Sequence, residues 1–232
     1  MSRIFIPASK PEDWKSLLAE PNKHWRTGYS AKAFAYCWQE ADGFPKCVKR
    51  VFRNSGIELF QNLKLLLAFP EYKVSLPPRG GRPSQNDIFV LAKGNNQLVS
   101  IAVEGKASES FDTTIAEWKL KDGKGKPTRL KFLCDELQLD KDQVDHIRYQ
   151  LLHRTASAII EAKKFKTENA LMLVHSFCKS NEWLEGFEDY RQFLALFGLK
   201  GITPDSLVFA KNIDGIDLYF SWVRGDEKYL DK

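Results

Sequence analysis

The chain has 232 residues, of which 43% are hydrophobic and 28% are charged, and its formal net charge is +5. This composition is that of a globular protein, which excludes a disordered chain, and the charge is far below that of a dedicated nucleic-acid coat protein. No apolar run approaches the ~20 residues of a membrane span, and the N-terminus has no apolar signal core, so we expect a cytoplasmic protein without membrane contact.

The chain before a loop at residues 77–84 is predicted to be mostly helical. The loop is rich in proline and glycine and can continue neither a helix nor a strand. Helices are expected over residues 10–20, 31–41, 45–54 and 56–69, the last from Ile57, Phe60, Leu63 and Leu67 at helical spacing. A short strand over residues 71–76 completes this half.

After the loop, predicted strands and helices alternate. Residues 87–93 and 98–104 are β-rich and are joined by Gly94-Asn95-Asn96-Gln97, a composition suited to a tight hairpin turn. We expect one long helix over residues 142–165, a doubly buried strand over 170–177, a helix over about 181–197, and a closing strand pair over 206–211 and 216–223. This order indicates an α/β fold with a central mixed sheet flanked by helices.

The hairpin turn determines which residues face each other. If residues 95 and 96 form a two-residue turn, the pairing that follows places Asp87 across from Glu104. Directly opposed residues project from one face with Cβ atoms about 5 Å apart. Lys106, two residues beyond Glu104, projects from that same side. The sequence therefore predicts that two carboxylates and an amine converge.

Two opposed carboxylates suit Mg²⁺, with Mn²⁺ as a substitute, because magnesium takes oxygen ligands and completes its coordination with water and substrate phosphate oxygens. Such a cation stabilises charge on a phosphorane and helps to deprotonate a water, and the Lys106 ammonium supports the nucleophile or the developing charge. Phosphodiester hydrolysis is the chemistry implied. A plainer interpretation stays open: Asp87 ends the polar loop, and Glu104 and Lys106 form a solvated salt bridge.

A resemblance rests on these residues. Asn86-Asp87, then sixteen residues, then Glu104-Gly105-Lys106 resembles the motif of the PD-(D/E)xK nuclease superfamily, although asparagine stands where that motif has proline. The resemblance covers about residues 56–177 and implies a restriction-endonuclease-like αβββαβ core. It implies that Asp87 and Glu104 bind the metal and that Lys106 is catalytic. It further implies that the Gly105 carbonyl and the helix-borne Glu58 are additional ligands.

Segments 103–118 and 149–158 also resemble an uncharacterised bacterial domain family, which implies no activity. Outside the motif, Gln150 and Arg154 lie one turn apart on the long predicted helix, where they would either touch the scissile phosphate or form an exposed polar stripe. Two loops beside the proposed site carry basic residues suited to a phosphate backbone: Arg79, Arg82, Lys121, Lys124, Lys126, Arg129 and Lys131. We assign Arg82 to substrate binding.

The remaining candidates for metal or redox chemistry are weak. The four cysteines are scattered and form no C-x-x-C pair: Cys37, Cys47, Cys134 and Cys178. They predict neither a zinc knuckle nor a redox dithiol, and we expect free, mostly buried thiols. His153 and His175 lack metal-ligand spacing, so we interpret both as structural.

We therefore expect one domain over residues 1–232, with an N-terminal helical segment (1–55), a nuclease-like core (56–177) and a C-terminal helix and strand pair (178–232). The functional hypothesis is a Mg²⁺-dependent nuclease acting on DNA. Two alternatives stay open: a catalytically inactive nuclease-like domain that binds nucleic acid or a protein, and a metal-dependent phosphoesterase acting on nucleotides. The sequence decides neither DNA against RNA nor whether the chain forms a homodimer.

Overall fold

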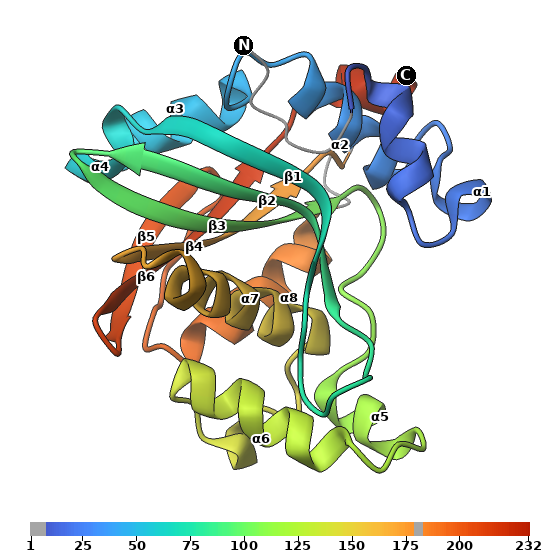
Figure 1. The fold of residues 1–232 in the computed structure, drawn as a ribbon, viewed down its shortest axis with the longest axis vertical. Coiled ribbons are helices and arrows are strands. Elements are labelled where there is room, and N and C mark those ends of the chain that lie inside the picture. Colours follow the sequence, from blue (N-terminus) through green and yellow to red (C-terminus); the bar gives the residue numbers. More distant parts are fainter. Residues whose placement is uncertain (1–7, 179–182) are drawn as a thin grey trace.

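The computed structural model describes residues 8–178 and 183–232. Its centre is a six-stranded mixed sheet with helices on both faces, as Figure 1 shows. Along the sheet the strand order is β1-β2-β3-β4-β6-β5. The strands are β1 (Lys64–Val74), β2 (Ser84–Gly94), β3 (Gln97–Lys106), β4 (Asn169–Ser176), β5 (Ser206–Ile213) and β6 (Ile216–Arg224). The predicted α/β class and the mixed sheet are confirmed.

The sheet combines two kinds of connection. Strands β1, β2 and β3 form an antiparallel meander, β4 is parallel to β3, β6 is parallel to β4, and β5 is antiparallel to β6. Two parallel neighbouring strands need a crossover connection between them. The crossover from β3 to β4 consists of α5 (Ile115–Leu120), α6 (Lys126–Leu137), η2 (Lys141–Gln143) and α7 (Tyr149–Phe165). Helix α7 then packs against β2, β3 and β4.

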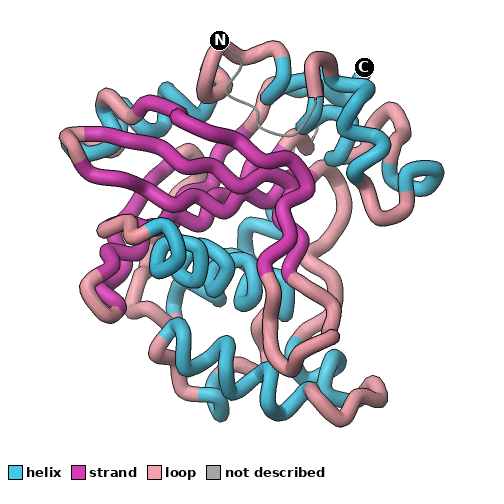
Figure 2. Tube along the Cα trace, in the orientation of Figure 1, coloured by secondary structure: helices cyan, strands magenta, loops and turns pink. Residues whose placement is uncertain are grey.

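Helices cover the two faces of the sheet separately, which Figure 2 makes visible by colour. The N-terminal helices and the last turn of the chain lie on one face: η1 (Pro11–Leu17), α1 (Pro21–His24), α2 (Ser30–Gln39), α3 (Lys46–Asn54), α4 (Glu58–Gln61) and η3 (Glu227–Asp231). Helices α7 and α8 (Leu184–Ala195) cover the other. Each face has its own hydrophobic core. Strand β4 lies between them and is buried at every position, as predicted for a strand covered on both sides.

The hairpin between β2 and β3 has the predicted turn. Asn95 and Asn96 have φ values of 45° and 63°, the left-handed conformation that a type I′ turn requires at both central positions. Gly94 pairs with Gln97, and the ladder continues without a bulge to Ile88 and Val103. The predicted register is therefore confirmed.

Three predictions of local structure are wrong. Residues 56–69 form helix only over Glu58–Gln61 before β1 begins, because a short apolar run fits both periodicities and pairing with β2 decides between them. The predicted helix over 142–165 begins only at Tyr149, since the preceding residue is held in an isolated bridge to Thr114. The basic segment expected as loop enters α6, which has proline in its first turn.

The predicted start of the helix over 181–197 lies outside the described residues, and α8 itself begins at Leu184. Within residues 8–178 and 183–232, none of the helices has the length and apolar composition of a membrane span.

Candidate functional site

Three carboxylates form a row across β1, β2 and β3. Ile88 pairs with Val103. Asp87 precedes Ile88 on β2 and Glu104 follows Val103 on β3, so the register puts those two acids opposite each other. In the β1–β2 ladder, the pairs on either side place Glu71 opposite Asp87. Glu71, Asp87 and Glu104 therefore occupy adjacent positions on neighbouring strands, at the end of the hairpin far from its turn.

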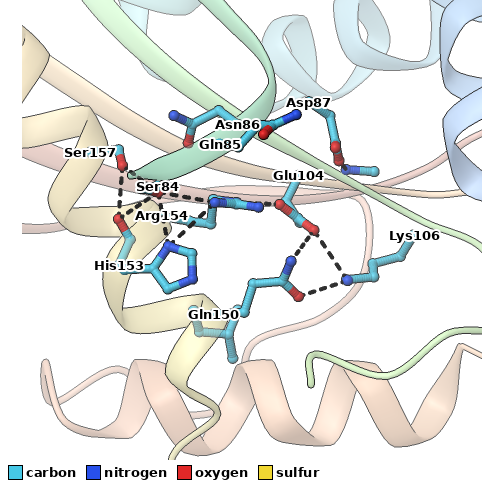
Figure 3. A network of polar contacts seen from close by, with 12 residues as sticks. Ser84, Gln85, Asn86, Asp87, Glu104, Lys106, Gln150, His153, Arg154 and Ser157 are labelled. Carbon is cyan, nitrogen blue, oxygen red and sulfur yellow. Dashed lines mark hydrogen bonds and ion pairs between the residues drawn. The ribbon is translucent and has the colours of Figure 1, made fainter. Parts of the chain in front are cut away.

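Glu104 is the centre of a buried polar network, drawn in Figure 3. Arg154 Nε donates to its Oε2 over 2.5 Å, while Gln150 Nε2 donates to its Oε1 over 2.6 Å. Lys106 Nζ lies 3.1 Å from the same Oε1. Burial raises the pKa of the Glu104 carboxyl, but the charges of Arg154 and Lys106 outweigh it and leave that pKa lowered. Glu104 is thus held as a carboxylate.

The predicted shared face of Gln150 and Arg154 is turned toward the sheet. Because both side chains come from α7 one turn apart, they reach Glu104 together rather than forming an exposed stripe. Gln150 also accepts from Lys106 Nζ over 2.8 Å. The structure therefore brings Glu104, Lys106, Gln150 and Arg154 into one cluster, with Gln150 and Arg154 bound to the acid.

Asp87 stands apart from this network in Figure 3. Its Oδ2 accepts from the backbone N–H of Gly105 over 2.6 Å. Burial, followed by the charges of Glu104 and Glu71, raises the pKa of the Asp87 carboxyl well above its usual value. Since the N–H and C=O of one strand residue point the same way, the Gly105 carbonyl is also directed toward β2. Asp87 and that carbonyl therefore lie on the same side of β3.

Glu71 is a site residue that the sequence analysis missed. It is a non-glycine residue with φ of 52° inside β1, and its carboxylate accepts from Gln85 Nε2 over 2.6 Å. Burial is the main cause that raises the pKa of Glu71 to about 7. Left-handed residues in strands concentrate at functional sites. The preceding Pro70, which cannot donate to a sheet ladder, was the sequence signal that β1 is irregular here.

Hydrogen bonds to groups on β2 and α7 hold the Arg154 guanidinium in place. Arg154 Nη1 donates to Ser84 Oγ over 3.0 Å, and Ser84 Oγ lies 2.8 Å from His153 Nδ1. Ser157 Oγ donates to the same serine over 2.9 Å. Burial and the charge of Arg154 lower the pKa of His153 well below its usual value, so the ring is neutral. His153, which we interpreted as structural, lies directly beside the site.

Glu58 does not reach this cluster, so its prediction as a metal ligand is wrong. It is exposed on α4, next to the turn end of the hairpin, where the Leu59 carbonyl packs against Gly94. Asp87 lies seven residues along β2 from Gly94, roughly 23 Å at the rise of a strand. The helix that carries Glu58 is too short and lies at the wrong end of the strands.

The predicted basic loops are only partly available to a ligand. Arg129 donates from Nε to the Pro77 carbonyl over 2.8 Å and from Nη1 to the Arg82 carbonyl over 2.8 Å, which ties α6 to the β1–β2 loop. Lys126 is bound to backbone carbonyls of the preceding segment. Arg79 and Arg82 are exposed on the tied loop. The charge of Arg82 is the last of the causes that lower the pKa of His153, after burial and the charges of Arg154, Arg129 and Lys106.

The donor set fits a hard divalent cation chemically, since it consists of carboxylate oxygens and a carbonyl. One further buried oxygen beside it, Asn86 Oδ1, has no hydrogen-bond partner. Oxygens around one magnesium ion lie within about 4 Å of each other. The ligand atoms of Glu71, Asp87 and Glu104 do not all come within 4.8 Å, so at least one acid has to turn to share an ion.

Comparison with known proteins gives a family but no activity. A family profile described as a domain of unknown function, DUF6946, matches residues 7–227. The chain belongs to this family. No curated protein and no solved structure gives a significant match. The family membership agrees with the resemblance to an uncharacterised domain family and adds no site residues.

Proposed function

We propose that the chain is a Mg²⁺-dependent phosphodiesterase of the nuclease class that cleaves DNA, and that its fold is a restriction-endonuclease-like core. The observation that carries the proposal is the row Glu71, Asp87 and Glu104 beside Lys106. Lys106 and Arg154 contact Glu104, and burial raises the pKa of the other two acids, Glu71 and Asp87. Perturbed groups of this kind concentrate at functional sites.

The order of elements supports the finer fold proposal. A short helix, an antiparallel meander of three strands, a long helix and a parallel fourth strand follow one another in α4, β1–β3, α7 and β4. This is the αβββαβ order of the nuclease core. The cluster lies where β2 begins and β3 ends, beside α7, so three elements of that core contribute to it.

The residues of this chain have separate roles in the proposal. Asp87, Glu104, Glu71 and the Gly105 carbonyl hold the cation, which when bound supplies charge neutralisation at the phosphate and a more acidic water. The Lys106 ammonium, already held by Gln150 and Glu104, stabilises the developing negative charge. Arg154 and Gln150 orient Glu104 and contact the phosphate, and the exposed Arg82 loop positions the nucleic-acid backbone. A cytoplasmic location is part of the proposal.

The test couples metal binding to cleavage. Titration calorimetry with Mn²⁺ should show binding to the full chain, with loss of binding in Asp87→Asn and in Glu104→Gln. Cleavage of a labelled DNA panel in Mg²⁺ should fall at least 100-fold in both variants and in Lys106→Met, which should still bind metal. Glu188→Gln, at an exposed acid on α8, is the matched control. Cleavage that survives Asp87→Asn and Glu104→Gln would rule this site out.

A second candidate function has its own observation. Both oxygens of Glu104 are already occupied, one by Arg154 and one by Gln150 and Lys106. A nuclease-like domain that has lost its metal would keep such a closed ion-pair network and bind nucleic acid or a protein instead. Such a domain should give no heat of Mn²⁺ binding that depends on Asp87. It should still bind DNA, with an affinity that falls as the salt concentration rises. Nucleotide substrates in the same panel test for a phosphoesterase.

A further inference from the structure

A second polar cluster lies on the opposite face of the sheet, under α2 and α3. The Sγ atoms of Cys37 and Cys47 and a ring nitrogen of His175 all lie within 4.8 Å of one another. Cys37 comes from α2, Cys47 from the first turn of α3, and His175 from β4. Ten positions separate the two cysteines, so no spacing motif reveals that they meet. Both are free thiols, as expected.

Trp38 determines where the proton of His175 lies. Its Nε1 donates to His175 Nδ1 over 3.1 Å, and an indole nitrogen can only donate. Nδ1 is therefore unprotonated, and the ring carries its proton on Nε2. That nitrogen lies 3.3 Å from Cys47 Sγ, so the ring N–H is directed at the sulfur.

The sulfur of Cys47 is held as a thiolate by hydrogen-bond donors. The Cys37 thiol has the largest effect, and with the His175 ring and the Val48 backbone N–H it overcomes burial and lowers the pKa of Cys47 to about 4. The first turn of a helix favours a thiolate further. Mainly through the same hydrogen bond, the pKa of Cys37 is raised. At neutral pH one sulfur is thus charged and the other keeps its proton.

A cavity of about 560 Å³ gives small molecules access to the pair. Its wall includes both cysteines, of which Cys37 is buried and Cys47 partly exposed. Charged side chains reach this cavity from α2, α3, the end of β6 and the last turn of the chain: Glu40, Lys46, Arg50, Arg224, Asp226 and Lys228. Cations outnumber acids there, which favours a thiolate over a thiol.

We propose that Cys47 is a nucleophilic site for small hydroperoxides and that Cys37 resolves the product. The Cys47 thiolate attacks one oxygen of the peroxide, the O–O bond breaks, and the other oxygen leaves as an alcohol or water after taking a proton from solvent. Cys47 becomes a sulfenic acid. The Cys37 thiol then attacks that sulfur, an S–S bond forms and water leaves. The peroxide is reduced, and the two thiols are oxidised to a disulfide.

Zinc is the competing occupant, because two thiolates and an imidazole are zinc ligands. The hydrogen bond from Trp38 argues against it. Ligation through Nε2 needs the ring proton on Nδ1, where the indole N–H already donates. Metal-bound histidines instead donate their second N–H to an acceptor. The indole therefore favours a thiolate–imidazole pair over a metal centre.

The test is the pH profile of alkylation in the reduced, full-length protein, read for each cysteine by peptide mapping. Iodoacetamide should modify Cys47 at a rate that changes less than threefold between pH 6 and 8. The rate for an ordinary thiol rises about 100-fold over that range. Cys37→Ala, which removes the hydrogen-bond donor with the largest effect on the Cys47 thiolate, should restore a rising profile. A wild-type rate for Cys47 that rises like that of free glutathione overturns the proposal.

Peroxide and zinc provide the second readout. One equivalent of hydrogen peroxide should yield a Cys37–Cys47 disulfide that dithiothreitol reverses, and Cys37→Ser should instead accumulate a sulfenic acid that dimedone traps. Cys134→Ser is the matched control, since burial raises the pKa of that thiol to about 11. One zinc ion per purified chain that protects Cys47 from alkylation contradicts the proposal. So does peroxide oxidation that spares Cys47.

Discussion

A negatively charged side chain lies beside β3 and β4 on each face of the sheet, Glu104 of β3 on one and Cys47 of α3 on the other, and the two charges are held by different means. Glu104 faces α7, where two cations, Arg154 and Lys106, neutralise it. Cys47 lies on the other side against His175, whose strand position pairs with Gly105. There the His175 ring, the Cys37 thiol and the Val48 backbone N–H hold the charge. Ion pairing fixes the carboxylate, whereas hydrogen bonding leaves the thiolate reactive.

The largest expected effect comes from removing one partner of the ion-paired face. Arg154→Met leaves Glu104 buried without its main counter-charge, and should lower the free energy of unfolding by about 3–5 kcal/mol. Urea denaturation measures this. Arg191→Met, at an exposed pair with Glu188, is the matched control and should cost under about 1 kcal/mol. Adding Glu104→Gln to Arg154→Met should recover part of the loss, because the unpaired charge is gone.

The acidic row also predicts a pH dependence of stability. The folded pKa of Glu71 is raised from 4.5 to about 7, so its contribution is full below pH 4.5 and is lost as the pH rises toward 7. Asp87, also raised, acts in the same direction. The loss attributable to Glu71 is at most about 3 kcal/mol. Denaturation series at several pH values should show this decline, and Glu71→Gln should flatten it; an unchanged slope in that variant contradicts the assignment.

Gly105 lies between Asp87 and the Phe34 ring, so a substitution there tests both faces of the sheet at once. A Cβ at this position would lie 2.9 Å from the Phe34 ring and 3.3 Å from Asp87 Oδ2. Phe34 packs against Trp38 and His175, so it has little room to move. Gly105→Ala should therefore cost about 1–3 kcal/mol. It should also weaken Mn²⁺ binding, which calorimetry would detect; unchanged metal affinity would separate Asp87 from the site.

Two substitutions with small effects on stability, one on each face, show whether the two clusters act independently. Ser84→Ala removes the acceptor for Arg154 Nη1 and should cost about 1 kcal/mol. It should leave the Cys47 alkylation profile unchanged. Cys37→Ala should cost a similar amount but should alter that profile. If both substitutions change both readouts, the two clusters are coupled through the sheet and the comparison fails.

Sequence reasoning succeeded where local chemistry decides the structure. The asparagine pair at residues 95–96 specifies its own turn, and that turn fixes every pairing of β2 with β3 as far as Ile88 and Val103. Helical periodicity placed Gln150 and Arg154 on one face without needing the fold. Their roles in catalysis stay predictions.

The remaining site residues depend on tertiary contacts that no local pattern records. Glu71 stood at the start of the strand predicted over residues 71–76, but only pairing with β2 puts it opposite Asp87. Cys37 and Cys47 belong to different helices, and β4 brings His175 to them. The prediction of Glu58 as a ligand also depended on tertiary structure. Its helix ends after four residues and lies at the other end of the strands.

The proposed metal centre is tested most directly by anomalous scattering from crystals of the full chain soaked in Mn²⁺. The account predicts one manganese peak per chain between Asp87 and Glu104, with the Glu104 carboxylate turned away from Arg154. Crystals soaked at millimolar Mn²⁺ above pH 7 that show no peak there, with the Glu104–Arg154 pair intact, would contradict it.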